Sequence, residues 1–234
     1  MTISTSTLLG DLVSEDPRRT RVLESYGLDY CCGGQRTLHE AAAAKGVDPD
    51  RVAADLLLPG EAAPLRWESS DLAGLAHDIV DTHHAYLWAE MPRLQALVTK
   101  VVGVHGDRHP ELAQVGDLYA RAVADLDPHL TREERVVFPA ITRLERTQAP
   151  VRLAGTTLGD AVQKLIDEHD VVGELLAQID RITDGYITPA DGCASYAAML
   201  AGLQQMEQDL HLHVHKENNV LFPKVVELDR RVSA

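Results

Sequence analysis

A motif that occurs twice constrains the fold of this chain more than any other feature. Each copy has an aspartate, a histidine and a glutamate at four-residue intervals, followed by Phe-Pro five residues after the glutamate. The first copy consists of Asp125, His129, Glu133, Phe138 and Pro139, and the second of Asp209, His213, Glu217, Phe222 and Pro223. In an α-helix, residues four apart share a face, so the histidine and glutamate of each copy are predicted to project together. The duplication therefore predicts two metal-binding helix faces that meet in one core.

The repeat extends upstream, because each half has a further histidine at nearly the same distance. His84 precedes His129 by 45 residues, and His169 precedes His213 by 44. The four imidazoles and the carboxylates of the two copies would then lie in the core of a helical bundle, where facing helices commonly build metal sites. This number of donors suits two metal ions that keep open coordination positions.

Two of these histidines have competitors nearby in the sequence. His211 and His215 are themselves four residues apart, so helical spacing alone does not choose between them and His213. The register of the repeat favours His213, because only this histidine has a glutamate four residues later and a phenylalanine nine residues later. His83 competes with His84, and the register favours His84 only modestly.

The ligand types favour iron over a structural zinc ion. Imidazole binds iron, copper, nickel and zinc, whereas carboxylates are hard donors that can bridge two ions. Structural zinc sites are usually closed by four ligands that often include cysteine, which this set lacks. We therefore expect two non-haem iron ions bridged by Glu133 and Glu217, with a position open to dioxygen, nitric oxide or oxide. The alternative is a bundle that holds zinc or manganese for stability alone.

Three acidic residues are candidate partners of these ligands. Asp125 and Asp209 each precede a candidate histidine ligand by one helical turn, and Glu168 directly precedes His169. A carboxylate behind a ligating histidine orients the imidazole and raises its basicity. The alternative is that the three are ordinary solvated residues on helix surfaces.

The helical patterns predict an all-α protein in two parts. Residues 1–58 are expected to form a small domain of short helices, with one helix ending at Gly46 and the next beginning at Asp48-Pro49. Residues 59–70 contain two prolines and a glycine and are expected to be a linker. Residues 71–234 are expected to form the metal-binding bundle.

Within the second part, apolar residues recur at three- and four-residue spacing over four long stretches. These predict helices at about 71–103, 109–146, 157–184 and 189–229. Short polar connections favour an up-down-up-down four-helix bundle. The helices contain four prolines, at which kinks are expected: Pro92, Pro128, Pro139 and Pro223.

Composition narrows the class of partner. The chain has 234 residues, is 45% apolar and carries a formal net charge of −14, which argues against a basic surface for nucleic acid or an anionic membrane. The N-terminus lacks the pattern of a secretory signal, and no apolar stretch is long enough to span a bilayer. We therefore expect a cytoplasmic protein without nucleic-acid or membrane partners; the oligomeric state is open, a homodimer included.

Two adjacent cysteines precede two glycines at Cys31-Cys32-Gly33-Gly34. Adjacent cysteines can close a strained disulfide, and such disulfides are commonly labile and functional. Cys31 and Cys32 are therefore candidates for a redox or iron-relay role near the bundle. The alternative is that two small residues fill a tight turn. The only other cysteine is Cys193, for which a structural role is expected.

The chain resembles the repair of iron centres family, the di-iron proteins of the ScdA and YtfE type. The resemblance covers nearly the whole chain and rests on four segments: Asp29-Tyr30-Cys31-Cys32-Gly33-Gly34, His129 to Glu134 with Phe138-Pro139, Glu168-His169-Asp170, and His213 with Glu217 to Pro223.

This resemblance implies a haemerythrin-like bundle after a short N-terminal domain. It implies that the four histidines of the repeat bind an oxo-bridged di-iron centre, with Glu133 and Glu217 as bridges. It further implies a role in restoring iron–sulfur clusters damaged by nitrosative or oxidative stress, by iron donation or by nitric oxide reduction. Damaged iron–sulfur proteins and small gases would then be the partners. The competing reading is a haemerythrin-like protein that binds oxygen or nitric oxide reversibly, as a carrier or sensor.

Overall fold

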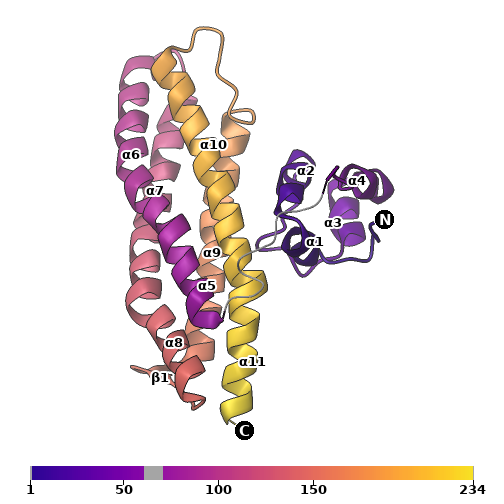
Figure 1. Ribbon diagram of the computed structural model, residues 1–234. Helices are drawn as coiled ribbons and strands as arrows, with labels where there is room; N and C mark the ends of the chain where they lie inside the picture. Colours follow the sequence, from indigo (N-terminus) through magenta and orange to yellow (C-terminus); the bar gives the residue numbers. More distant parts are fainter. Residues whose placement is uncertain (1, 61–70, 234) are drawn as a thin grey trace.

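The computed structural model describes residues 2–60 and 71–233 of the chain. Nearly all regular structure in these residues is helical, which confirms the predicted all-α class. A group of short helices, the N-terminal module (residues 2–60), lies against the middle of a long helical bundle (Figure 1). The linker expected at residues 59–70 falls mostly outside the described residues. No described helix is both long enough and apolar enough to traverse a lipid bilayer.

Local sequence signals define the helices of the N-terminal module. Thr37 begins one helix with a capping box, in which its hydroxyl accepts from Glu40 N and the Glu40 carboxylate accepts from Thr37 N. That helix ends at Gly46, whose positive φ of 69° suits glycine. Asp48 caps the next one, as predicted. The elements are α1 (Leu9–Glu15), a 3₁₀ turn (Pro17–Arg19), α2 (Thr20–Ser25), α3 (Leu38–Lys45) and α4 (Pro49–Asp55).

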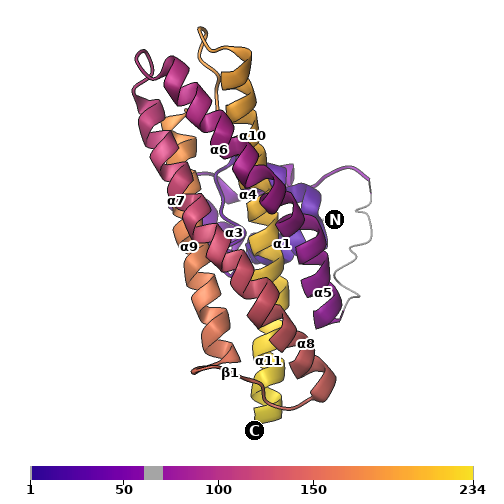
Figure 2. The ribbon, with the colours of Figure 1, turned by 90° about the vertical axis from the view of Figure 1, so that its left-hand side faces the viewer.

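Four long antiparallel rods form the bundle, three of them divided by a π-helical turn (Figures 1 and 2). The first is α5 (Leu72–Ile79), a π turn (Val80–His84) and α6 (Ala85–His105). The second is α7 (Glu111–Arg132), a π turn (Glu133–Val137) and α8 (Phe138–Thr147). A small antiparallel hairpin, β1 (Arg152–Leu153) and β2 (Thr156–Thr157), leads to the third rod, α9 (Leu158–Ile182). The fourth is α10 (Ala194–His215), a π turn (Lys216–Leu221) and α11 (Phe222–Ser233).

The π turns occur at the same place in both copies of the repeat. The backbone N–H of Phe138 donates to the carbonyl of Glu133, and that of Phe222 donates to Glu217, each five residues back. A proline follows each phenylalanine and has no backbone N–H to donate. Each proline lies in the first turn of α8 or α11, where a backbone N–H has no partner within the helix, so its absence costs little. The sequence predicts kinks at these prolines, and the structure places a π turn directly before them. Such turns often mark functional sites.

A layer of buried polar side chains divides the bundle core at the level of the π turns. On one side, apolar residues of α6, α7, α9 and α10 form a cluster around Tyr119 and Met206. On the other, α5, α8, α9 and α11 pack around Phe138 and Phe222. A third cluster fills the N-terminal module and includes Val214 of α10, so the module and the bundle share apolar contact.

Candidate metal centre

The polar layer contains the six candidate ligands predicted from the repeat. They come from all four rods, and none is more than 5% exposed. The six residues are His84, His129, Glu133, His169, His213 and Glu217. Burying polar or charged groups costs free energy, so such groups are usually paired or bound to metal when they are buried.

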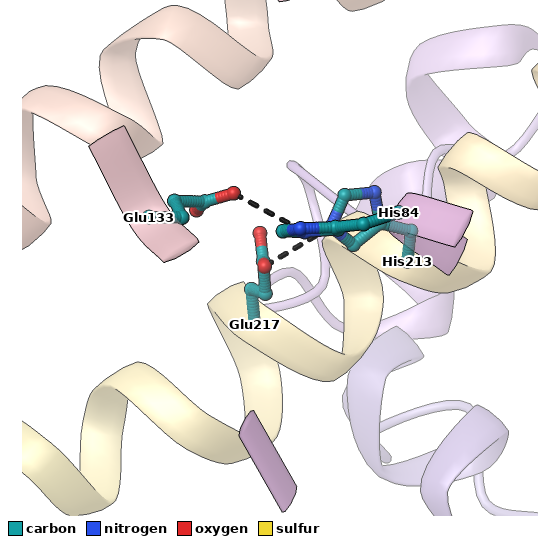
Figure 3. Close-up of side chains that lie close together, drawn as sticks. All are labelled: His84, Glu133, His213 and Glu217. Carbon is teal, nitrogen blue, oxygen red and sulfur yellow. Dashed lines mark hydrogen bonds and ion pairs between the residues drawn. The ribbon is translucent and has the colours of Figure 1, made fainter. Parts of the chain in front are cut away.

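The six side chains form two overlapping groups that share both glutamates. One group is His84, Glu133, His213 and Glu217, shown in Figure 3. The other is His129, Glu133, His169 and Glu217. Within each group the potential ligand atoms lie within 4.8 Å of one another.

Each glutamate lies between the two histidine pairs. Glu133 Oε2 is 3.4 Å from His84 Nε2 and 3.3 Å from His129 Nε2. The Glu217 carboxylate is 3.0 Å from His213 Nε2 through Oε1 and 3.1 Å from His169 Nε2 through Oε2. A carboxylate that faces two ion positions is the geometry required to bridge two metals.

The buried donors fit a pair of cations. Both carboxylate oxygens of Glu133 are buried and receive no hydrogen bond from any described residue. The two imidazoles of each pair also point their Nε2 atoms at one another, at 3.2 Å for His84 and His213 and 3.1 Å for His129 and His169. Four ring nitrogens and two carboxylates therefore converge without enough hydrogen-bond donors between them. A metal ion between each pair would satisfy these atoms.

Electrostatics within the cluster hold the carboxylates in their charged form. Burial alone would raise the pKa of Glu217, but His213 and His169 lower it well below the usual range. The pKa of Glu133 is lowered in the same way by His129 and His84, against burial and the nearby charge of Glu217. Charged carboxylates are the form that binds metal.

The histidines respond to burial in different ways. Burial would lower the pKa of His129, yet the negative charge of Glu133 beside the ring outweighs burial and raises the pKa to about 9. The pKa of His84 is raised by Glu133 and Glu217 against the same effect of burial. For His213 burial prevails and lowers the pKa.

The candidate histidine ligands of the first and second rods each have a carboxylate partner at Nδ1, the ring nitrogen that faces away from the cluster. His84 Nδ1 donates to Glu134 Oε1 at 3.0 Å, and the Trp88 indole donates to the same oxygen at 2.8 Å. His129 Nδ1 donates to Glu168 Oε2 at 2.9 Å. Arg132 fixes that carboxylate with a contact of 2.6 Å. Such partners set which ring nitrogen faces the metal.

The Nδ1 atoms of the other two histidine ligands have no carboxylate partner among the described residues. His169 Nδ1 donates to the amide oxygen of Asn218 at 2.9 Å. His213 Nδ1 has no hydrogen-bond partner among the described residues, but the ring stacks on His83 with centroids 5.4 Å apart. His83 in turn lies 3.0 Å from Asp209.

The acidic partners predicted from sequence are only partly where they were expected. Glu168 does support a ligand, but this ligand is His129 on a neighbouring rod. Asp209 contacts His83 instead of the histidine one turn later. Asp125 is exposed and lies outside both groups of potential ligand atoms, so nothing among the described residues supports its predicted role.

Glu134 and Asn218 were missed in the sequence, although the repeat carried the signal. Each directly follows the glutamate of its copy. Each also supports the upstream histidine of one half, Glu134 with His84 and Asn218 with His169. Extending the repeat by one position would have identified both.

The competitors of His213 lie at the interface with the N-terminal module. His215 Nε2 is 3.3 Å from the Ser14 hydroxyl, and burial lowers the pKa of this histidine to about 4. His211 is 3.5 Å from Glu24. The register of the repeat therefore selected the histidine that lies in the cluster.

The adjacent cysteines face the bundle as free thiols. Cys31 is buried, Cys32 is partly buried, and their sulfur atoms are 3.9 Å apart. Hydrogen bonding to Cys32 and burial raise the pKa of Cys31 well above its usual range. Both cysteines line a cavity of about 30 Å³ that is also lined by His129, His169 and His213. The cysteine loop and the candidate ligands thus share one space.

Asn219 joins this loop to the bundle. Its side-chain nitrogen donates to the carbonyls of Tyr30 and Cys31 at 3.2 and 2.9 Å. A Cβ atom on Gly34 would lie 2.3 Å from the Asn219 side chain and 2.6 Å from the Tyr30 carbonyl. The close contact between Asn219 and the cysteine loop therefore requires glycine at position 34.

Comparisons with known proteins agree with this architecture. Residues 5–58 match the ScdA_N family model, described as a domain of unknown function (DUF542). Residues 75–225 match the haemerythrin HHE cation-binding domain. The chain is 30% identical over 224 residues to the iron–sulfur cluster repair protein ScdA of Staphylococcus haemolyticus, covering 95% of this chain and 99% of that protein.

Two further relatives match this chain along most of their length. The chain is 33% identical over 219 residues to the iron–sulfur cluster repair protein YtfE of an Enterobacter species, covering 93% of this chain and 96% of the relative. It is also 33% identical over 220 residues to YtfE of Escherichia coli, with the same coverage. The chain therefore belongs to the ScdA and YtfE family of iron–sulfur cluster repair proteins.

Proposed function

We propose that this protein repairs damaged iron–sulfur clusters by means of two non-haem iron ions held in the bundle. The observation that carries the proposal is the sharing of Glu133 and Glu217 by two histidine pairs. The relatives are named as iron–sulfur cluster repair proteins, which supports the choice of damaged iron–sulfur proteins as clients. Mixed imidazole and carboxylate ligation without thiolate supports iron.

In this proposal the four histidines are terminal ligands and the two glutamates bridge. A bound iron pair, with an oxo bridge, would supply redox chemistry and positions at which nitric oxide or dioxygen can bind. Glu134, Glu168 and Asn218 would keep the ligating imidazoles oriented. These contacts hold the geometry while iron is gained or lost.

The cavity beside the cluster gives small molecules a place next to the proposed metals. Its walls are mostly apolar and include Leu126, Val172 and Leu210. A space of about 30 Å³ is sufficient for one small molecule such as water or a diatomic gas. Cys31 and Cys32 line the same cavity, which supports a redox or iron-relay role for them.

Cluster repair can be measured directly. An iron–sulfur enzyme inactivated by nitric oxide is incubated with the iron-loaded protein, and the recovery of its activity and cluster absorbance is followed. Recovery is expected with the wild type and should be lost in Glu133→Ala. The matched control is Asp125→Ala, which removes a carboxylate on the exposed face of the same helix and should leave repair unchanged. Equal recovery with Glu133→Ala would overturn the proposal.

A second measurement separates iron donation from nitric oxide reduction. Nitric oxide is added to the reduced, iron-loaded protein, and both nitrous oxide and released iron are quantified. Nitrous oxide without loss of iron supports an enzymatic role. Transfer of iron to the client supports donation. Reversible binding with neither product would contradict the repair proposal in favour of a gas carrier or sensor.

A further inference from the structure

A second group of metal-capable side chains lies in the N-terminal module, outside the six-residue cluster. It consists of Asp29, Cys31 and Cys32, whose potential ligand atoms lie within 4.8 Å of one another. The two sulfur atoms are 3.9 Å apart, and Cys31 Sγ is 3.2 Å from Asp29 Oδ1. Two thiols and a carboxylate are a different donor set from the imidazoles and carboxylates of the bundle.

The spacing of these donors suits one tetrahedral ion. Metal–sulfur bonds of about 2.3 Å at a tetrahedral angle place two sulfurs roughly 3.8 Å apart. A metal–oxygen bond of about 2.0 Å places oxygen roughly 3.5 Å from each sulfur. The observed separations of 3.9 and 3.2 Å are close to both values. A disulfide, by contrast, needs sulfurs about 2.0 Å apart.

The loop backbone holds the carboxylate in place. Asp29 Oδ1 accepts hydrogen bonds from the backbone N–H groups of Cys31 and Cys32, each at 3.0 Å. Asp29 Oδ2 accepts from the backbone N–H of Gly33 at 3.0 Å. A Cβ atom on Gly33 would lie 2.7 Å from the Asp29 carbonyl, so this turn also depends on glycine. The donor group is therefore preorganised without metal.

The group faces the proposed di-iron centre across the shared cavity. Cys31 and Cys32 line this cavity together with His129, His169 and His213. Asn219 fixes the carbonyl of Cys31 to the π turn that also contains Glu217.

We infer that Asp29, Cys31 and Cys32 form a third metal site, which holds a single divalent ion such as Fe²⁺ in transit between the bundle and a client. Three protein donors leave a tetrahedral ion one open position, whereas structural sites are usually closed by four. Binding forms two metal–sulfur bonds as the two thiol protons pass to solvent, and no electron is transferred. The transit role rests on the proposed function, but binding of an ion at this site does not.

Cobalt is a suitable probe because thiolate-to-Co²⁺ charge transfer absorbs in the near ultraviolet and the bundle ligands contain no sulfur. Co²⁺ is titrated into the full-length, iron-loaded protein, with the iron-loaded protein alone as the blank. The absorption is expected in the wild type and in Cys193→Ser, which removes the only other thiol. It should disappear in the Cys31→Ser, Cys32→Ser double variant.

Asp29→Asn tests the charge of the carboxylate. Its amide oxygen can still accept from the backbone N–H groups of Cys31 and Cys32, whereas the acceptor for the Gly33 N–H is lost. The affinity for Co²⁺ should fall at least roughly tenfold. A roughly tenfold loss is the smallest effect expected when a ligand only loses its hydrogen-bonding partner, and Asp29 is itself a proposed ligand. Circular dichroism and iron content check that each variant is folded. Absence of the thiolate band in the wild type, or its persistence in the double cysteine variant, would overturn the third site.

A separate measurement tells failure of this site from failure of the proposed function. Glu133→Ala should lose bundle iron but keep the Co²⁺–thiolate band, because the two donor sets are independent. If the band is present and the wild type restores no clusters, the repair function fails and the third site stands. If clusters are restored and no band appears, the third site fails and the repair function stands.

Discussion

The side-chain nitrogen of Asn219 donates a hydrogen bond of 2.9 Å to the carbonyl oxygen of Cys31. This contact joins residues 188 positions apart and links the cysteine loop to the bundle. Asn219 belongs to the same π turn as Glu217 and Asn218, which face the candidate metal centre. Three consecutive residues thus provide a carboxylate shared by both groups of candidate ligands, a partner for a candidate histidine ligand and an anchor for the cysteines.

Replacing this anchor should expose the cysteine loop. Asn219→Ala removes two hydrogen bonds to loop carbonyls, each worth about 1 kcal/mol. A loss of 1 to 2 kcal/mol raises the open population by roughly 5- to 30-fold. The rate of Cys31 alkylation, measured by mass spectrometry in a Cys193→Ser background, should rise accordingly. Gln163→Ala, which removes an exposed hydrogen bond on α9, is the control; equal rates in both variants would refute the anchoring role.

The sequence predicted the bundle well because its signals are local and repeated. Each of the four predicted long helices corresponds to one rod. In the N-terminal module, one helix ends at Gly46 and the next begins at Asp48, as expected. The register of the duplication also selected His213 over two neighbours. These inferences depend on spacing within one helix, which the order of residues determines directly.

Relations between rods could not be predicted in the same way. Glu168 of the third rod accepts a hydrogen bond from His129 of the second rod. Asp209 contacts His83 of the first rod instead of His213. The π turns at Glu133 and Glu217 rotate the residues that follow, which a uniform helical period does not anticipate. The docking of the cysteine loop on Asn219 likewise depends on tertiary packing.

Loss of either bridging carboxylate should remove metal. In Glu133→Ala and in Glu217→Ala each proposed metal position loses a ligand. Metal affinity should therefore fall by more than roughly 100-fold, the largest loss expected when a ligand only loses its hydrogen-bonding partner. Iron content after dialysis and the melting temperature with and without metal report the change, because metal binding contributes to folding stability. Asp125→Ala is the matched control on the same rod. Unchanged iron content in both glutamate variants would contradict the bridging role.

The outer carboxylates should tune affinity without abolishing it. Glu134→Gln and Glu168→Gln keep an acceptor for the histidine but remove the negative charge, so metal affinity should fall by about 10- to 100-fold. Competition with a chelator measures this change. Asp209→Asn should have a smaller effect, since Asp209 contacts His83 and no candidate ligand directly. Equal losses in all three variants would show a general effect of charge.

Cys193 should be the most reactive thiol at neutral pH. Hydrogen bonding to His105, 3.2 Å from the sulfur, lowers the pKa of Cys193 to about 7, whereas that of Cys31 is raised. The thiolate of Cys193 should therefore form as pH rises through about 7. In a Cys31→Ser, Cys32→Ser background, alkylation should follow this midpoint.

Removing His105 tests the cause of that reactivity. His105→Ala should move the midpoint towards the ordinary value of 9. At pH 7 far less thiolate is present, but its greater intrinsic nucleophilicity offsets part of the loss, so alkylation should slow roughly fivefold. The same midpoint in both proteins would exclude the histidine as its cause.

The central claim is that two histidine pairs share two glutamates and hold two iron ions. The most direct test is the metal content and absorption spectrum of protein produced with iron. Two irons per chain are expected, with oxo-to-iron charge-transfer absorption near the ultraviolet that is lost in Glu133→Ala. One zinc ion per chain with a featureless spectrum would contradict it.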